Sequence, residues 1–456
     1  MAVLRPSRRA LTGWGRTNSS LAEVWEGPHH EVPAALKESG VRGALVRGLG
    51  RSYGDAAQNA GGMVLRLAGS AHQAVLDEQR CTVTVPAGVS FDDLLRVIVP
   101  RGYFPPVTAG TRFITVGGAI ASDIHGKNHH IDGSFGNHIE SLTMLLADGS
   151  QVVVGPQQQP ELFWTTVGGM GLTGVILDAT FRLIPIETSR MAVDTIRVPD
   201  LDALFAEMSS PEDDVRYSVA WVDLVAKGRS LGRSVLSRGD HARLDQLQPK
   251  QLVSPLAYGP HQLVSVPPLV PPQGVLNHAT VAAFNEFWFR KSPRHRVDEI
   301  QGIGTFFHPL DFVGSWNRLY GSRGMLQYQF VVPFGEDAAM RTVIERLSAS
   351  GSASFLAVLK RFGSSNTAPL SFPAPGWTLT LDLPAAARSV GDLLHELDRI
   401  VLAAGGRHYL AKDSHTTPAA IRRGYPRLAE WKAVRNAVDP NRVWQSDLSR
   451  RLGLTD

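Results

Sequence analysis

The spacing of apolar and polar residues changes several times along the chain, and each change predicts a different element. Residues 81–86 alternate between apolar and polar side chains, which predicts a β-strand. Residues 91–99 have helical spacing, and Ser90 before them and Pro100 after them are typical start and stop signals of a helix. Apolar runs on both sides of Asp148-Gly149 predict a β-hairpin. The N-terminal part is therefore predicted to be α+β.

The pattern changes after Pro185, where glycine becomes less frequent and longer elements are predicted. Helices are expected at residues 201–208, 337–350, 393–404 and 428–438, and strands at 325–332, 377–383 and 408–411. The chain has 456 residues, too many for one ordinary core. We therefore expect at least two domains.

Three stretches are so rich in glycine that they are predicted to be loops or turns, namely residues 48–55, 108–122 and 162–174. Within the second, residues 117–121 could open a short helix whose free N–H groups suit a phosphate. That stretch runs directly into titratable side chains, which are Asp123, His125, Lys127, His129 and His130. This combination is typical of a cofactor pocket with reactive side chains at its entrance. A tight turn between two core strands is the alternative interpretation of the stretch.

Composition excludes several classes of protein. Apolar residues make up 43% of the chain and the net charge is +4, which is typical of a globular protein and too small a charge to indicate nucleic-acid binding. Cys81 is the single cysteine, so an internal disulfide and a cysteine-clustered metal site are excluded. Arg8-Arg9 lacks a following apolar run, and neither a signal peptide nor a transmembrane helix is visible. We expect a soluble or membrane-peripheral protein.

Several motifs together resemble a known superfamily. Residues 47–54, 115–126, 148–149, 168–174 and 439–440 recur in this order in FAD-dependent oxidases of the vanillyl-alcohol-oxidase superfamily. Residues 125–130, 133–138, 326–330, 368–373 and 411–414 resemble one branch more closely, the decaprenylphosphoryl-β-D-ribose 2-oxidases. That branch is the flavoprotein half of the epimerase that makes the arabinose donor of actinobacterial cell walls. The resemblance covers nearly the whole chain.

The resemblance implies an α+β, two-domain PCMH-type FAD-binding fold with an antiparallel-sheet substrate domain. Residues 1–187 would form the FAD-binding domain, 188–405 the substrate domain, and 406–456 a segment returning to the FAD domain. FAD would be noncovalent, because Arg51 stands where several members carry a histidine bonded to the flavin. The residues expected to bind FAD are Gly48, Gly50, Arg51, Ser52, Tyr53, Gly110, Thr111, Thr115, Gly117, Gly118, Ser122, Gly126, Asn128, Gly174, Tyr409 and Ala411.

The implied activity is oxidation of the ribosyl 2-hydroxyl of decaprenylphosphoryl-β-D-ribose to a ketone, which a separate NAD(P)H-dependent reductase would reduce to the arabino epimer. A base must take the hydroxyl proton, and His125 and Lys412 both map onto site residues of the family. The expected substrate residues are Tyr53, Trp221, Tyr320, Gln327, Gln329, Lys360 and Thr380. Lys360 would suit the phosphate. The two glutamines share one strand face and could hydrogen-bond the sugar hydroxyls, and a solvent-facing polar row is the alternative interpretation.

Thr380 is a departure from the family, because the mycobacterial enzymes carry a cysteine in this strand. The hydride chemistry needs no thiol, but the departure puts thiol-directed covalent inhibition in doubt. Residues 263–296 combine prolines, aromatic residues and a basic end, which suits an interface with anionic lipid. A Pro-rich loop with a core helix is the alternative. By resemblance the chain would be peripheral at the cytoplasmic membrane, on its periplasmic face.

Two other functions remain open at this stage. An aldonolactone or alditol oxidase would share the flavin loops but act on soluble sugars, and a non-catalytic flavoprotein would only bind the carrier lipid or a partner. Reduction of the bound flavin by a polyprenyl-phosphoryl ribose, but not by free sugars, separates the three.

Overall fold

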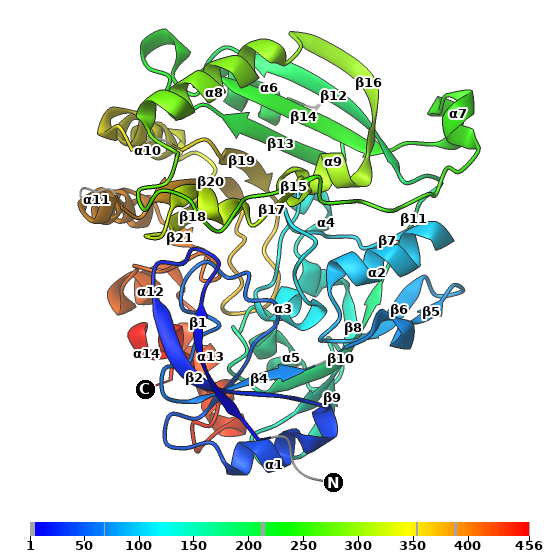
Figure 1. Ribbon diagram of the computed structural model, residues 1–456, viewed down its shortest axis with the longest axis vertical. Helices are drawn as coiled ribbons and strands as arrows, with labels where there is room; N and C mark the ends of the chain where they lie inside the picture. The colour runs from blue at the N-terminus through cyan, green and yellow to red at the C-terminus, as the bar shows by residue number, and fades with distance from the viewer. Residues whose placement is uncertain (1–4, 68, 211–214, 353, 387–389, 456) are drawn as a thin grey trace.

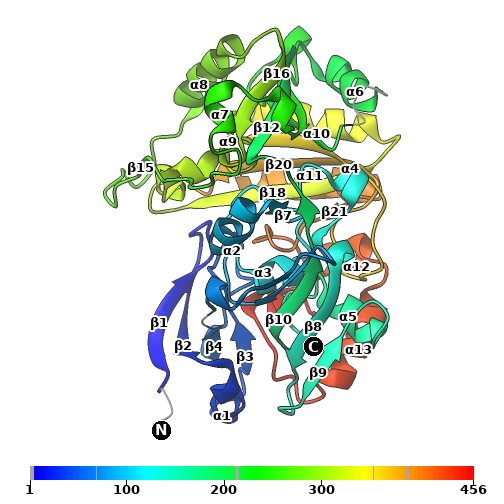
Figure 2. The same cartoon turned by 90° about the vertical axis from the view of Figure 1, so that its right-hand side faces the viewer.

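The computed structural model describes residues 5–67, 69–210, 215–352, 354–386 and 390–455. Two smaller sheets form one half of the molecule and a large sheet forms the other half (Figure 1). The N-terminal strands, in blue, and the C-terminal helices, in red, lie in the same half. Figure 2, turned by 90°, shows the same division.

Two sheets are built from the N-terminal part of the chain. The first has the order β1-β2-β4-β3 and comprises β1 (Ser7–Thr12), β2 (Ser19–Gly27), β3 (Ala44–Val46) and β4 (Met63–Leu67). The second is antiparallel, has the order β5-β6-β10-β8-β9, and comprises β5 (Val75–Asp77), β6 (Thr82–Pro86), β8 (Ile139–Leu145), β9 (Gln151–Val154) and β10 (Val175–Arg182). The short strands β7 (Tyr103–Phe104) and β11 (Ile184–Pro185) pair beside them. The helices here are α1 (Val32–Lys37), α2 (Phe91–Ile98), α3 (Val116–Ala121), α4 (His129–Asp132) and α5 (Pro160–Thr166).

Local signals account for most of these elements. The Ser90 hydroxyl accepts a hydrogen bond from the Asp93 N–H and starts α2, whose apolar face is buried. The predicted strand at 81–86 and the hairpin around Asp148-Gly149 are confirmed as β6 and β8–β9. The prediction that residues 162–174 form only a turn is wrong, because α5 runs through Thr166. Its Leu162 and Phe163 are buried, and glycine begins only at position 168.

The large sheet is antiparallel and has the order β16-β12-β14-β13-β19-β20-β18-β21. Its strands are β12 (Arg190–Val198), β13 (Tyr217–Val222), β14 (Ser234–His241), β16 (His295–Gly302), β18 (Met325–Pro333), β19 (Ala357–Phe362), β20 (Gly376–Pro384) and β21 (Arg407–His408). The helices of this half are α6 (Leu201–Ser209), α7 (Pro249–Leu252), α8 (His278–Lys291), α9 (Ile303–Phe307), α10 (Asp337–Ser350) and α11 (Val390–Ala403), and β15 (Val264–Ser265) pairs with β17 (Val313–Gly314).

The two faces of the large sheet differ in character, as alternation along a strand requires. Tyr328 and Phe330 of β18 pack with the apolar sides of α6, α10 and α11 in one buried core. Gln327 and Gln329 of the same strand point to the other face and line a cavity. The predicted helix at 337–350 and the strands at 325–332 and 377–383 are confirmed within one residue at each end.

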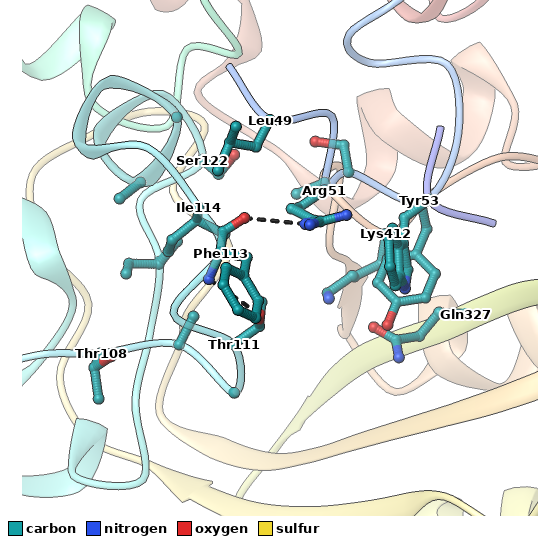
Figure 3. A pocket seen from close by; sticks show the side chains of 18 of the residues that line it. Leu49, Arg51, Tyr53, Thr108, Thr111, Phe113, Ile114, Ser122, Gln327 and Lys412 are labelled. Carbon is teal, nitrogen blue, oxygen red and sulfur yellow. Dashed lines mark hydrogen bonds between the residues drawn. The ribbon is translucent and has the colours of Figure 1, made fainter. Parts of the chain in front are cut away.

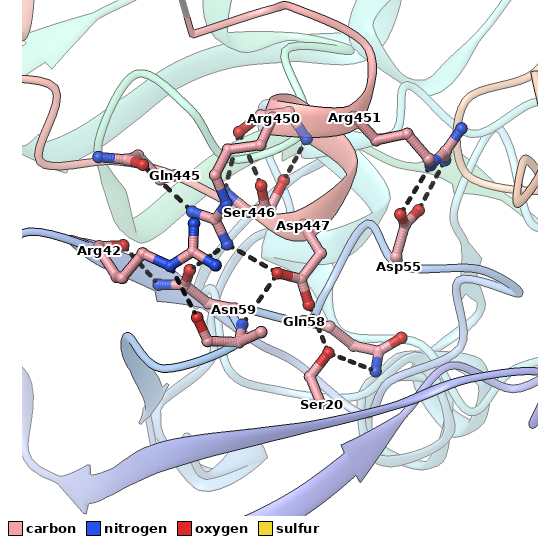
Figure 4. A network of polar contacts seen from close by, with 12 residues as sticks. Ser20, Arg42, Asp55, Gln58, Asn59, Gln445, Ser446, Asp447, Arg450 and Arg451 are labelled. Atoms are coloured by element: carbon pink, nitrogen blue, oxygen red, sulfur yellow. Dashed lines mark hydrogen bonds and ion pairs between the residues drawn. The ribbon is translucent and has the colours of Figure 1, made fainter. Parts of the chain in front are cut away.

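The C-terminal segment contacts both halves. Its β21 (Arg407–His408) extends the edge of the large sheet beside β18, so the predicted strand 408–411 is wrong except at His408. Helices α12 (Pro418–Gly424), α13 (Leu428–Val438) and α14 (Asp447–Arg451) lie beside the two smaller sheets (Figure 1). Figure 4 shows how α14 is held: Asp447 accepts the Ala60 N–H at 2.9 Å, and Arg451 forms a two-pronged ion pair with Asp55 at 2.7 and 2.8 Å.

Helix α8 is the exposed element of the large-sheet half. Within it only Val281 and Asn285 are buried, whereas Phe284, Phe287 and Trp288 are exposed. The alternative that this segment forms a core helix is therefore wrong. In the described part of the chain, no helix has the length and apolar character needed to cross a bilayer.

Candidate active site

One cavity of about 1170 Å³ lies between the glycine-rich loops of the small-sheet half and the polar face of the large sheet. Figure 3 shows Arg51 and Phe113 at one wall and Tyr53, Gln327 and Lys412 at the other. The side chains come from loops and strands that are far apart in the sequence, so the fold alone brings them together.

The glycine-rich wall leaves room for a ligand to approach the backbone. Thr115 starts α3, because its hydroxyl accepts the Gly118 N–H at 3.1 Å. A Cβ on Gly48 would lie 2.3 Å from the Thr115 hydroxyl, so glycine is needed for the two loops to touch. A Cβ on Gly110 would meet nothing within 4 Å, so this residue faces open space in the cavity. The expectation that α3 presents free N–H groups to a phosphate is wrong, because the N–H groups of Val116 and Gly117 donate to the carbonyls of Val89 and Ala87. What suits the pyrophosphate of a dinucleotide here is the close approach to the backbone that the glycines allow.

Arg51 joins the two glycine loops. Its Nε donates to the Phe113 carbonyl at 3.0 Å (Figure 3). Its guanidinium lies 4.2 Å from the centre of the Trp14 ring. Burial lowers the pKa of Arg51, although the group remains a cation at any physiological pH. The arginine offers a charge and donors to a ligand but no nucleophile for a covalent bond to a flavin.

Lys412 lies at the opposite wall, on a turn that packs against the first loop. The Tyr53 N–H donates to the Ala411 carbonyl at 3.0 Å, and Lys412 Nζ lies 4.2 Å from the centre of the Tyr53 ring. Burial lowers the pKa of Lys412 to about 8, and the nearby carboxylate of Asp382 opposes that shift. A lysine with such a pKa is partly neutral near pH 8 and can accept a proton.

Asp382 lies behind this wall. Gln327 Nε2 donates to Asp382 Oδ1 at 2.5 Å, which fixes the glutamine that lines the cavity. Burial raises the pKa of Asp382 to about 7, against the opposing effects of Gln327 and Lys412. The carboxylate therefore orients one amide that faces the cavity and raises the pKa of Lys412.

His125 is engaged at both ring nitrogens. Lys360 Nζ lies 3.1 Å from Nδ1, and the side-chain amide nitrogen of Gln329 lies 2.9 Å from Nε2. The ring centre of Phe362 is 4.7 Å from that of the imidazole. Burial, with the positive charges of Lys360 and Lys412, holds the pKa of His125 well below its usual range. His125 is thus a neutral group held in place.

Asp123 holds the turn that carries His125. Its buried carboxylate accepts hydrogen bonds from Ser134, Ser371, Asn366 and the Gly136 N–H. The residue has a positive φ of 41°, a strained conformation that these four donors maintain. Sequence reasoning grouped Asp123 with the titratable side chains of the pocket, but its contacts assign it a structural role.

Most of the residues expected at the site line the cavity. They are Gly48, Gly50, Arg51, Ser52, Tyr53, Gly110, Thr111, Thr115, Gly117, Gly118, Ser122, His125, Gly126, Gly174, Trp221, Gln327, Gln329, Lys360, Thr380, Tyr409, Ala411 and Lys412. Asn128 and Tyr320 differ from expectation and do not border it. The Asn128 amide turns away to the Pro106 carbonyl at 2.7 Å, and Tyr320 is buried in a cluster behind Tyr53.

Sequence reasoning missed several contributors to the cavity. Lys127 borders it but was given no role, and Trp14, Phe284 and Trp288 belong to the same lining. Trp14 comes from the loop after β1, which no motif singles out. Lys127 carried a signal, because it belongs to the run of titratable side chains that directly follows the glycine-rich stretch.

Comparisons with known proteins agree with this geometry. The family model described as FAD binding domain matches residues 29–155, and the model described as D-arabinono-1,4-lactone oxidase matches residues 384–452. The decaprenylphosphoryl-beta-D-ribose oxidase of Mycolicibacterium smegmatis is 45% identical over 452 residues, which are 98% of each chain. The alditol oxidase of a Streptomyces species is 24% identical over 97% of this chain and 99% of its own.

The glycine-lined wall of the cavity and the cation of Arg51 fit FAD. The fold, with its mixed helices and antiparallel sheets, is that of the PCMH-type FAD-binding superfamily. Identity of 45% over nearly the full length of both proteins is far above what a shared fold requires. The chain therefore belongs to the decaprenylphosphoryl-β-D-ribose oxidase family of FAD-dependent oxidoreductases.

Proposed function

We propose that the chain oxidises the 2-hydroxyl of the ribosyl group in decaprenylphosphoryl-β-D-ribose to a ketone, with FAD as cofactor. One observation carries the proposal: the glycine-lined wall suited to FAD and the cluster of Gln327, Gln329 and Lys412 border a single cavity. The ketone would be the first half of an epimerisation, and a separate NAD(P)H-dependent reductase would complete it. The name of the M. smegmatis relative supports this substrate.

The side chains of the cavity divide the work of the reaction. Bound FAD supplies the acceptor for the hydride that leaves the carbon. Lys412 takes the hydroxyl proton, because its pKa of about 8 leaves a usable neutral fraction and its Nζ borders the cavity. Gln327, fixed by Asp382, and Gln329, fixed beside His125, present amide groups to the sugar hydroxyls. His125 orients Gln329 and Lys360 and takes no proton.

FAD is held without a covalent bond in this proposal, because Arg51 occupies the first loop and Cys81 lies outside the cavity lining. Acid precipitation tests this directly. All flavin should remain in the supernatant, and flavin in the protein pellet would contradict noncovalent binding.

The lipid part of the substrate leaves the cavity beside α8. Phe284 and Trp288 line the cavity and are also exposed, and Phe287 beside them is 60% exposed. Lys291 and Arg294 follow as exposed cations, whereas Arg290 is paired with Glu286. Aromatic residues next to cations suit the surface of an anionic bilayer, so we propose peripheral binding to the membrane here, on the periplasmic face.

Vesicle flotation tests the membrane contact. The protein should float with vesicles that contain phosphatidylglycerol, and Phe287→Ser should reduce the bound fraction several-fold. Val41→Ser, which alters a fully exposed side chain far from α8 in the sequence, is the matched control. Equal flotation of both variants would place the membrane contact elsewhere.

Alditol oxidation is the second candidate, favoured by the lactone-oxidase match at residues 384–452 and the full-length alditol oxidase relative. Anaerobic mixing of the FAD-loaded protein with each substrate separates the two activities. Farnesylphosphoryl-β-D-ribose, a short soluble analogue, should bleach the flavin absorbance, whereas xylitol and free ribose should not. Bleaching by alditols alone would overturn the proposed function.

A further inference from the structure

Two lysines that border the cavity, Lys127 and Lys360, form no ion pair with a carboxylate among the residues that the structure describes. Lys127 Nζ donates to the Phe306 carbonyl at 2.5 Å and lies 4.0 Å from the centre of the Phe306 ring, and Lys360 Nζ contacts His125. Each ammonium has three donors, so two on each lysine remain for a ligand. Among the described residues of the lining, Asp311 is the only carboxylate. It is occupied by Thr111 and Arg112.

The other titratable groups near the two lysines supply no negative charge. Burial lowers the pKa of His129 and of His308 to about 3, and it holds that of His125 well below its usual range, so all three are neutral. Lys412 is a further positive group, and its charge lowers the pKa of Lys360. The positive charges of Lys127 and Lys360 are therefore not balanced by a nearby carboxylate among the described residues.

The covalent structure of the substrate determines where its phosphodiester must lie. In a ribosyl-1-phosphate ester the phosphorus is attached through one oxygen to C1, the carbon next to the one that is oxidised. The phosphodiester must therefore lie close to the groups that receive the 2-hydroxyl. Lys360 contacts His125, and Lys127 is two residues beyond it.

We propose, resting on the proposed function, that Lys127 and Lys360 together bind the phosphodiester of the substrate. Lys127 is fixed for this role, because its carbonyl accepts the Ser218 N–H from β13 at 2.9 Å and its Nζ lies 4.0 Å from the centre of the Phe306 ring. The subsite lies where the loop after α3, which carries Lys127, meets β13 and β19 of the large sheet. It recognises a phosphodiester and makes neutral sugars poor ligands.

Proton uptake is a consequence of this arrangement. Burial lowers the pKa of Lys127 to about 7, and burial with the charges of Lys412 and Lys127 lowers that of Lys360 to about 7. A bound anion favours the charged lysine and raises its pKa. Binding at pH 8 therefore takes up protons, and affinity decreases as the pH rises above about 7.

A ligand that binds without reacting tests the subsite independently of turnover. Farnesylphosphoryl-β-D-2-deoxyribose lacks the hydroxyl that is oxidised, so calorimetric titration of the FAD-loaded protein measures binding alone. Lys127→Met should lower its affinity roughly 10- to 100-fold, as expected for one lost charge-assisted hydrogen bond. The variant should also lose proton uptake, measured at pH 8 in buffers of different ionisation enthalpy. Lys127→Arg should retain most of the affinity.

Two controls distinguish a loss of phosphodiester binding from a general defect of the variant. Lys250→Met, which alters an exposed lysine, should bind the ligand normally. Methyl β-D-ribofuranoside, which has no phosphate, should bind wild type and Lys127→Met equally. The proposed subsite would be overturned by any of three results for Lys127→Met. These are an unchanged affinity for the phosphodiester, an equal loss of affinity for both ligands, and a lower FAD content. Wild-type flavin that is not reduced by farnesylphosphoryl-β-D-ribose would instead overturn the proposed function.

Discussion

Lys360 places its Nζ 3.1 Å from Nδ1 of His125, a contact between residues 235 positions apart. An ammonium can only donate, so Nδ1 accepts from the lysine and the neutral ring carries its proton on Nε2, toward the side-chain amide of Gln329, whose oxygen is the atom that can accept it. With a pKa far below its usual range, the imidazole stays neutral throughout the physiological pH range. The sequence left His125 and Lys412 as equal candidates for the base, and this contact favours Lys412.

The pH dependence of flavin reduction should therefore follow Lys412. A base must be neutral to accept a proton, so the rate constant should rise as the pH passes through about 8 and level off above it. Lys412→Met should remove this rise and lower the plateau by roughly 10²- to 10⁴-fold, the usual contribution of a general base. Anaerobic stopped-flow measurements from pH 6 to 9.5 give both values. A rate constant that falls through the same pH range would show that the charged lysine is the active form.

Asp382 should shift the pH dependence of flavin reduction. Its carboxylate raises the pKa of Lys412, so Asp382→Asn should move the rising limb to lower pH. Gln327 loses its charged acceptor in the same variant, so the apparent affinity for substrate should also decrease. Asp240→Asn, which removes an exposed carboxylate, should leave the profile unchanged. An unshifted limb in Asp382→Asn would mean that another group sets the pKa of the base.

Local patterns predicted the elements well because their causes are local. Alternation in residues 325–332 correctly placed Gln327 and Gln329 on one face, and Ser90 correctly marked the start of α2. The long-range contacts could not be read in this way. Lys360 reaches His125, and Ser371 reaches Asp123 across 248 positions, only because the large sheet docks on the glycine loops.

Asn128 and Tyr320, the two expected site residues that do not line the cavity, show the same limit of prediction from sequence. Asn128 follows His125 closely, but its backbone turns and directs the amide to Pro106. Tyr320 was expected to contact the substrate, yet it is buried in one apolar cluster with Trp316 and Tyr53. Spacing along the chain gives the neighbourhood of a site, whereas side-chain direction depends on packing partners that are distant in sequence.

FAD loading should depend on Gly110. A side chain there meets no protein atom within 4 Å, so Gly110→Val would fill the cavity without disturbing the fold. We expect the variant to purify with less than about a tenth of the wild-type flavin and an unchanged melting temperature of the FAD-free protein, since only ligand approach is blocked. Gly40→Val, at another glycine with open space, is the control. Gly117 is a poorer choice, because its Cβ would lie 3.0 Å from that of Ala87. Full flavin content in Gly110→Val would move the cofactor away from this loop.

Thr380 faces the cavity from the middle of β20, opposite Gln329 of β18 and Val358 of β19. A hydroxyl is a weak nucleophile, so thiol-directed inhibitors should bind the natural protein only reversibly at this position. A cysteine there would face the positive charges of Lys360 and Lys412, which also line the cavity and lower a thiol pKa. Thr380→Cys should therefore carry a reactive thiolate near neutral pH.

Labelling with iodoacetamide followed by intact-mass spectrometry tests this position. The background should be Cys81→Ser, because Cys81 is the one natural thiol and is partly exposed. One adduct should form on Thr380→Cys in minutes at pH 7.5, and prior addition of farnesylphosphoryl-β-D-2-deoxyribose should slow its formation, since sugar and reagent compete for the same space. Flavin reduction by farnesylphosphoryl-β-D-ribose should persist before labelling and be lost after it. A thiol that reacts equally fast with and without the ligand would place residue 380 away from the bound sugar, and an unreactive thiol would place it outside the accessible cavity.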